Sequence, residues 1–192
     1  MIINIEITGT TALICNKFTD AAAMAATSQT RSSIIGDRGT PAEQAEKKLY
    51  RGLKDNLIIP QPNLFSCIID GGKFHKAGRS KVTTQKSSLI PTCVEIIETE
   101  IQIISKEGWR VDSRAVRIPS TGGRIIAHRP MFDDWELKFS VELDTEFMSE
   151  KMFRQILDDA GKRIGLGDYR PACKGPFGKF VVTSWSEELK AA

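Results

Sequence analysis

The sequence has no long apolar run, no closely spaced pair of cysteines and no leader-like start. A membrane helix needs roughly 18 consecutive apolar residues, and even the isoleucine-rich stretch Val94–Ile104 is interrupted by Glu95, Glu98 and Glu100. The four cysteines are scattered without a Cys-x-x-Cys motif, so neither a zinc knuckle nor a redox centre is indicated. The start, Ile2–Ile7, lacks the basic residues and the cleavage site of a secretory signal. We therefore expect a cytoplasmic protein with reduced thiols, no membrane contact, no metal and no cofactor.

The chain also has no large excess of positive or negative charge. The 192 residues include 27 lysines and arginines against 24 aspartates and glutamates, a net charge of +3, with 41% hydrophobic residues. A chain of this length buries roughly 70% of the surface that its unfolded form exposes, which excludes disorder as the main state and favours one domain over residues 1–192. A net charge this small neither indicates nor excludes a nucleic-acid binder, so the positions of the charges decide.

Hydrophobic periodicity predicts four strands and two helices. Alternating apolar residues or β-branched runs mark strands at Ile3–Ile7, Val94–Ile104, Trp135–Leu143 and Phe177–Trp185. A Thr-Pro-x-Glu motif starts a helix at Thr40 that stops near Gly52, and Ser149 caps a second helix with apolar residues at helical spacing. The order β-α-β-β-α-β is that of a ferredoxin-like, RNA-recognition-like α+β fold, whose helix-free sheet face often binds single-stranded nucleic acid or a partner.

Three segments fall outside this predicted core. Residues 13–40 form a loop or a short helix around Ala21–Ala26. Residues 53–92 form a basic insertion, in which glycines and prolines surround a hairpin expected at Leu64–Ile69. Residues 105–134 form a protruding β-ribbon, where Trp109–Ile118 and Arg124–His128 flank a turn-rich Pro-Ser-Thr-Gly-Gly stretch.

The densest local signal follows the second helix, where glycines alternate with cations from Gly161 to Lys179. Glycine permits positive φ angles and a close backbone approach, so the amides of such a loop can meet phosphate oxygens. The alternative interpretation is a glycine-rich helix end with solvated cations. Neither a dinucleotide-binding motif nor a P-loop is present, because the loop follows a helix and no Gly-Lys-Ser/Thr occurs.

Together, the order of elements, the ribbon and the loop Gly161–Gly178 resemble the RAMP superfamily of CRISPR-associated proteins. The closest likeness is to the subunits that coat guide RNA as the backbone of type I and type III effector complexes. The resemblance implies a ribbon that acts as a thumb and a loop that touches RNA backbone through Gly165, Gly167, Arg170 and Gly178. The chain is short for such a subunit, with a reduced helical insertion, so a stand-alone or phage-encoded relative is an alternative.

Cations concentrate in three segments that the core does not need: residues 73–86 of the basic insertion, residues 110–129 of the ribbon and residues 162–179 of the glycine-rich loop. Residues 71–91 carry no acidic residue, and the ribbon is rich in arginine. Loop cations neutralise phosphates and release counterions, and guanidinium groups hold phosphates bidentately, whereas solvated charges on a mobile loop are the alternative. The predicted nucleic-acid contacts, with the glycines of the loop included, are Lys73, His75, Lys76, Arg79, Lys81, Arg110, Arg114, Arg117, Arg124, Arg129, Lys162, Arg163, Gly165, Gly167, Arg170, Lys174, Gly178 and Lys179.

Catalytic residues are only weakly indicated. The two histidines of the chain, His75 and His128, lie far apart inside basic stretches. The resemblance implies that either can act in acid–base cleavage of RNA, with His128 preferred, but an RNA-contacting or solvated histidine is the favoured interpretation. Some of the resembled type III subunits cut RNA with an acidic residue after the first strand, where Asp20 and Asp37 lie.

The sequence therefore predicts a non-catalytic protein that holds single-stranded RNA or guide RNA by its backbone. We expect it to self-associate along the strand or to bind other effector-complex subunits. Two alternatives remain open. One is a phage-encoded mimic of a backbone subunit that inhibits a CRISPR effector complex, and the other is a RAMP-type, metal-independent endoribonuclease.

Overall fold

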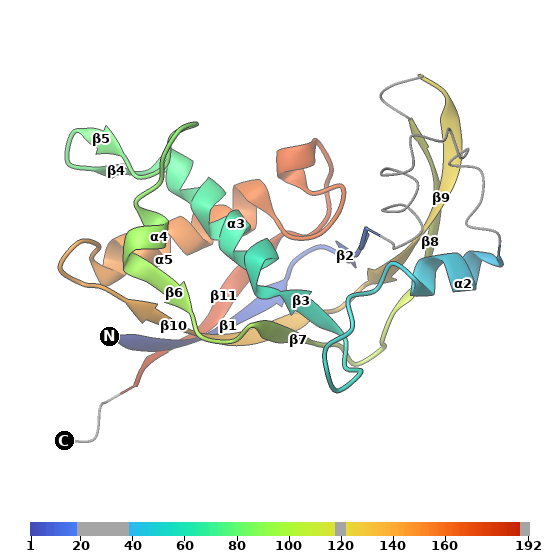
Figure 1. The fold of residues 1–192 in the computed structure, drawn as a ribbon, viewed down its shortest axis with the longest axis horizontal. Coiled ribbons are helices and arrows are strands. Elements are labelled where there is room, and N and C mark those ends of the chain that lie inside the picture. Colours follow the sequence, from blue (N-terminus) through green and yellow to red (C-terminus); the bar gives the residue numbers. More distant parts are fainter. Residues whose placement is uncertain (19–38, 118–121, 189–192) are drawn as a thin grey trace.

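The computed structural model describes residues 1–18, 39–117 and 122–188. Its architecture is α+β, as expected, and consists of a main antiparallel sheet, a second sheet that carries the ribbon, and a small hairpin (Figure 1). The segment around Ala21–Ala26, with Asp20 and Asp37, lies outside the described residues. No helix in the described part of the chain is long and apolar enough to span a membrane.

The main sheet is built around strand β1 (Ile2–Gly9). The strand order is β11-β1-β10-β7-β3, with β6 also paired to β10, and every pairing is antiparallel. Its other strands are β3 (Ile58–Pro60), β6 (Val94–Ile96), β7 (Glu100–Ile104), β10 (Glu136–Leu143) and β11 (Phe180–Glu187). The expected strands therefore form, although the last one begins three residues later than predicted.

The expected strand Val94–Ile104 is interrupted between β6 and β7. At the break, the carboxylate of Glu98 accepts a hydrogen bond of 2.8 Å from the backbone N–H of Ser140, which replaces a backbone partner. The backbone N–H of Ile97 still donates to the Ser140 carbonyl at 3.0 Å. The interruption thus bends the strand without leaving the ladder unsatisfied, so β-branched composition alone overestimated its regularity.

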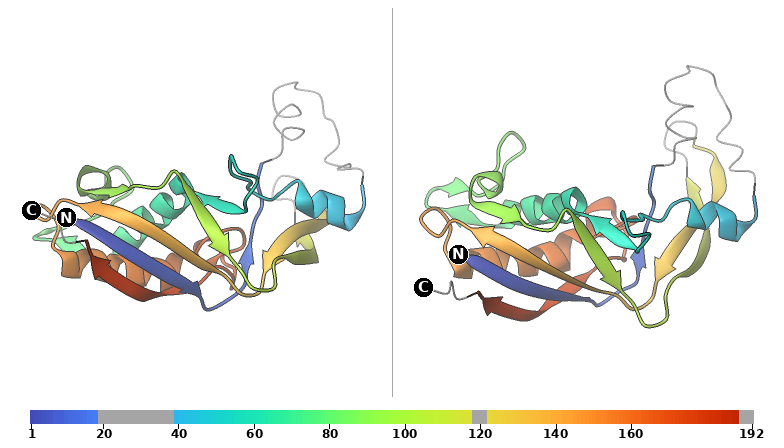
Figure 2. Two further views of the ribbon diagram at one scale, coloured as in Figure 1. Left: turned by 90° about the horizontal axis from the view of Figure 1, so that it is seen from below. Right: turned by 60° about the horizontal axis from the view of Figure 1, so that its bottom comes forward.

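Two helices cover one face of the main sheet, α3 (Gln61–Gly71) and α5 (Glu150–Asp159), and Figure 2 shows the sheet from its uncovered side. The alternation of β1 places Ile3, Ile5 and Ile7 in the core beneath these helices. The predicted cap of α5 is confirmed, because the Ser149 hydroxyl accepts from the Met152 N–H at 3.3 Å. A π-helical turn, η2 (Ala160–Ile164), continues α5 into the glycine-rich loop.

The hairpin expected at Leu64–Ile69 is wrong, because these residues form the centre of helix α3. Leu64, Cys67 and Ile68 are buried at helical spacing, and the proline at position 62 falls in the first turn, where a missing N–H costs little. At the other end, a Cβ on Gly71 would come within 2.7 Å of the Ile156 carbonyl oxygen in α5. The prolines therefore mark the start of the helix, and the glycine allows its end to pack closely against α5. A short helix, α4 (Ile90–Cys93), follows the insertion.

The helix expected from Thr40 to Gly52 is shorter than predicted and does not cover the main sheet. Helix α2 (Pro41–Glu46) has the predicted capping box, in which the Thr40 N–H donates to Glu43 at 2.7 Å and the Glu43 N–H donates to the Thr40 hydroxyl at 3.3 Å. It lies beside the ribbon, and the Lys48 ammonium just beyond it donates to the His128 carbonyl at 2.8 Å (Figure 1). The first helix over the sheet is therefore α3 and not this segment.

The ribbon consists of β8 (Arg110–Arg117) and β9 (Arg124–Phe132), which pair in register from Arg110 opposite Met131 to Arg117 opposite Arg124. The short strand β2 (Leu13–Ile14) pairs with the other edge of β9 and completes the second sheet. The ribbon projects at one end of the molecule (Figure 1). The protruding hairpin predicted within residues 105–134 thus forms, with β9 four residues longer than expected.

Candidate nucleic-acid interface

The glycine-rich loop after η2 is closely packed against the body of the protein. Gly165, Gly167 and Gly178 have positive φ angles of 75°, 72° and 69°. The Gly165 N–H donates to the Ala160 carbonyl at 2.9 Å, and the Gly178 N–H donates to the Ala12 carbonyl at 2.8 Å. These two amides are therefore committed inside the protein and are not free to bind phosphate.

Steric contact explains why the loop needs glycine. A Cβ on Gly178 would overlap the carbonyl oxygen of Leu166, and a Cβ on Gly167 would overlap the carbonyl oxygen of Ile14. The two halves of the loop and the end of β2 thus approach one another at backbone distance, which a larger residue would prevent. The glycines therefore shape the loop, and its cations are the groups that it offers to an anion.

The cations of the loop differ in how firmly they are held. Lys162 and Lys174 are exposed, with no ion pair among the described residues. Arg163 bonds Asp159 at 2.8 Å, and Arg170 is half-buried and donates to the Gly167 carbonyl at 3.0 Å. Among the described residues, Lys162 and Lys174 are therefore the exposed loop cations without an ion pair, and Arg170 has further guanidinium hydrogens left for a ligand. The predicted contact Lys179 is half-buried beside β11.

Three of the five ribbon arginines are paired with carboxylates. Arg110 forms a bidentate pair with Asp133, and this hydrogen bond holds the pKa of the Asp133 carboxyl below its usual range. Arg114 bonds Asp112 and lies over the ring of Phe177, 4.7 Å from its centroid. Both arginines could reach a ligand only by giving up part of these contacts.

Arg129 is placed where a phosphate cannot reach it, although the sequence suggested it as an RNA contact. Its side chain is 5% exposed and donates to Asp168 at 2.7 Å and to Asp112 at 3.2 Å. Its Nε atom has no hydrogen-bond partner among the residues that the structure describes. Asp112 is itself 5% exposed, so Arg129 is held within the ribbon by a buried pair, and its bond to Asp168 joins the ribbon to the glycine-rich loop.

The far end of the ribbon presents the other two arginines. Arg117 and Arg124 face each other across β8 and β9, both exposed, and neither has an ion pair within the described residues. Ile126 beside them is 66% exposed. This end therefore combines free guanidinium groups with apolar surface.

A second group of free cations lies on the small hairpin formed by β4 (Lys76–Ala77) and β5 (Ser80–Lys81). Lys76 pairs in register with Lys81, and Arg79 lies in the turn between them. These three are exposed and have no ion pair in the part of the chain that the structure describes. Two like charges opposite one another are unfavourable without an anion, so this hairpin suits a phosphate chain. The predicted contact Lys73 is instead paired with Asp70.

The two histidines lie in unrelated environments. His75 Nε2 is 3.0 Å from Asp159 Oδ2, at the base of the β4–β5 hairpin. Burial would raise the pKa of Asp159, but its hydrogen bond and charge interaction with Arg163, together with His75, lower it on balance. His128 Nδ1 lies 2.7 Å from the Ser113 hydroxyl on the ribbon. Among the described residues, no group of three or more acidic, cysteine or histidine side chains is arranged to hold a metal ion.

The uncovered sheet face does not have the features of a single-strand platform. The alternation of β1 and β10 places Glu6 and Glu142 on it, and its Lys138 is bonded to Glu6 at 2.7 Å. The aromatic residues of β11, Phe180 and Trp185, pair opposite positions of β1 that face away from it. In the described strands this face presents carboxylates and no stacking ring, which is unfavourable for RNA. The β4–β5 hairpin, the glycine-rich loop and the ribbon end lie on the helix side instead (Figure 1).

Comparisons with known proteins show a likeness of fold. Neither a protein family model nor a curated protein sequence matches the chain. Among solved structures, it is similar to a chain in the cryo-EM structure of the type III-B Cmr-β complex bound to cognate target RNA, with a TM-score of 0.56 and 11% identity. The match covers 96% of this chain and 59% of the other, so this chain spans well under two thirds of that protein's length. The likeness is one of fold alone.

Proposed function

We propose that this chain binds single-stranded RNA by its backbone, without cutting it, as a subunit of a CRISPR-type ribonucleoprotein. The observation that carries the proposal is the set of unpaired cations on one side of a fold that also occurs in an RNA-bound effector complex. Within the part of the chain that the structure describes, these cations are Lys76, Arg79, Lys81, Arg117, Arg124, Lys162 and Lys174.

We also propose that the core is ferredoxin-like. In such a core the four strands lie in the order fourth, first, third, second, with both helices on one face. Here β11, β1, β10 and the interrupted strand β6/β7 lie in that order, with α3 and α5 on one face (Figure 2). Strand β3 is then an addition at the edge.

The salt dependence of RNA binding tests the role of the free cations. Each phosphate contact to a single strand contributes about 0.7 to the slope of log affinity against log salt. A triple variant with Lys76, Arg79 and Lys81 changed to alanine should therefore lower the slope by about 2. The matched control is the pair of variants Arg51→Ala and Lys138→Ala, two cations engaged in surface ion pairs elsewhere.

The outcome separates the proposal from its alternatives. We expect wild-type protein to retain RNA of unchanged length, and the controls to keep the wild-type slope. An unchanged slope in the triple variant would refute backbone binding through this hairpin. Products ending in a cyclic phosphate would instead favour the endoribonuclease.

Self-association along the strand is the second part of the proposal. Two apolar side chains, Ile126 on β9 and Phe147 after β10, are each 66% exposed. The ribbon and the loop that follows β10 lie at opposite ends of the long axis (Figure 1). A head-to-tail contact between two such ends is heterologous and repeats along a filament. Ile126→Asp and Phe147→Asp should each stop RNA-induced assembly in analytical ultracentrifugation. An equal mixture of the two should recover only dimers, because one intact contact remains possible.

A further inference from the structure

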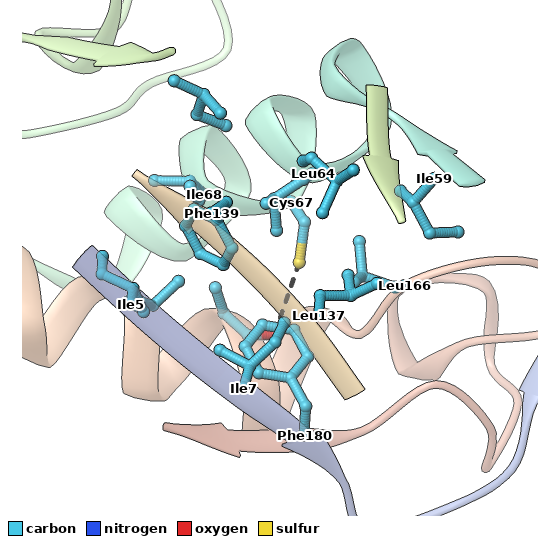
Figure 3. Close-up of a cluster of buried hydrophobic side chains, with 14 of the residues drawn as sticks. Ile5, Ile7, Ile59, Leu64, Cys67, Ile68, Leu137, Phe139, Leu166 and Phe180 are labelled. Carbon is cyan, nitrogen blue, oxygen red and sulfur yellow. Dashed lines mark hydrogen bonds between the residues drawn. The ribbon is translucent and has the colours of Figure 1, made fainter. Parts of the chain in front are cut away.

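A cleft of about 300 Å³ opens between α3, the segment after β2 and the glycine-rich loop. Its floor is apolar, with Ile59, Cys67 and Leu166 drawn from three separate elements and each at most 3% exposed (Figure 3). Burial raises the pKa of the Cys67 thiol, and likewise that of Cys15, which also lines the cleft, to about 12. Both thiols are therefore protonated at neutral pH and suit neither a metal ion nor nucleophilic chemistry.

One wall of the cleft carries polar side chains without partners. Asn63 and Ser66 lie three residues apart on α3, so they share a face of the helix, and both are exposed. Neither side chain has a hydrogen-bond partner within the described residues. An amide offers a donor and an acceptor, and a hydroxyl offers both, which is the pattern that reads the edge of a planar heterocycle.

The opposite wall carries two charged side chains, Asp168 and Arg170, and among the described residues only the charge of Asp168 is neutralised. The Asp168 carboxylate accepts from Asn16 at 3.1 Å and from Arg129 at 2.7 Å, so its charge is neutralised. Arg170 donates one N–H to the Gly167 carbonyl at 3.0 Å, and its other guanidinium hydrogens have no protein acceptor among the described residues. The cleft thus has an apolar floor, a neutral polar wall and one cation at its edge.

We propose that this cleft binds one unstacked base of the RNA chain, with Asn63 and Ser66 bonded to the base edge and Arg170 on its phosphate. The volume lies at the lower end of the range of small-ligand sites, roughly 300–1,000 Å³, which suits a single nucleotide. Bases splayed out of a single strand are the usual targets of sequence-specific RNA recognition. The inference rests on the proposed function and gives the chain a base preference that phosphate contacts cannot supply.

The test compares base preference with salt dependence in the same titrations. Oligomers of A, U and C of one length are bound to wild type, to the double variant Asn63→Ala/Ser66→Ala, and to Asn4→Ala as a control from the uncovered sheet face. We expect wild type to prefer one base by at least about fivefold, and the double variant to lose that preference with the salt slope unchanged. The control should keep both.

Each outcome has a separate meaning. Wild type that binds no RNA would overturn the proposed function itself. RNA binding with the expected salt slope but equal affinity for the three oligomers would overturn the base site alone, as would a preference that survives in the double variant. Nucleoside monophosphates form a further arm. If the double variant loses only their binding, while its preference among oligomers is intact, the cleft takes free nucleotides and not a base of the RNA.

Discussion

The side chain of Arg129 ties the ribbon to the glycine-rich loop, and replacing it measures what this buried junction contributes. Arg129→Met keeps most of the side-chain length while removing its bonds to Asp112 and Asp168. Breaking a buried ion pair by removing one partner costs about 3–5 kcal/mol, because a buried charge is left behind. Asp112 keeps its bond to Arg114, and Asp168 is 31% exposed, so we expect the lower end, about 3 kcal/mol.

The same ribbon supplies a matched control. Arg110 is also paired with an aspartate, but its side chain is 57% exposed against 5% for Arg129. An exposed ion pair contributes about 0–1 kcal/mol, so Arg110→Met should change the free energy of unfolding by less than about 1 kcal/mol. Urea denaturation followed by circular dichroism measures both variants, with the m-value checked for a constant unfolding transition. Hydrogen exchange of the β9 amides then shows whether the loss is local.

Two results would contradict this reasoning. Equal and small losses for both variants would mean that burial does not distinguish the two pairs. A fall of about 0.7 in the salt slope of RNA binding by Arg129→Met would mean that this guanidinium contacts phosphate, despite its burial.

The remaining predictions concern the loop, the thiols and one carboxyl. Gly178→Ala should lower the free energy of unfolding by about 3 kcal/mol or more, since its Cβ overlaps a backbone oxygen, whereas Gly78→Ala, at a similar φ in open space, should cost about 1 kcal/mol by urea denaturation. In native protein, iodoacetamide should modify the exposed Cys173 and spare Cys67, whose pKa burial raises to about 12, as peptide mass spectrometry will show. Burial opposes the lowered pKa of Asp159, but its arginine and histidine partners prevail, so its stabilisation is present above about pH 4 and lost below. Asp159→Asn should therefore flatten the fall in urea midpoint between about pH 5 and pH 3.

Much of the sheet could be predicted from the sequence because its signals are local. The alternation in β1 and β10 and the caps at Thr40 and Ser149 involve residues a few positions apart. Helix α3 was missed because Pro60 and Pro62 at its start and Gly71 at its end are residue types that also mark turns. The signal that could have found it is the spacing of Leu64 and Cys67, with Ile68 and Gly71, which follows one helix face.

The site could be predicted less well, because ion pairing is a property of the fold. Asp168 neutralises Arg129 from 39 residues away, and Asp133 neutralises Arg110 from 23 residues away. Counting the cations within a segment of the sequence reveals neither of these ion pairs. The same limit applies to the glycines, whose amides bond carbonyls such as that of Ala12 far along the chain.

The distribution of unpaired charge decides which side of the fold an RNA chain can follow. The uncovered sheet face carries Glu6 and Glu142, which repel phosphate, and its lysine is already bonded to one of them. The β4–β5 hairpin, the glycine-rich loop and the ribbon end lie on the helix side (Figure 1). They carry exposed cations that have no ion pair among the described residues, and the glycine-rich loop also lines the cleft. Coulomb interactions with a polyanion therefore favour the helix side, even though the sheet is the familiar surface for single strands in folds of this kind. The net charge of +3 adds charges from every part of the chain, so it describes neither face.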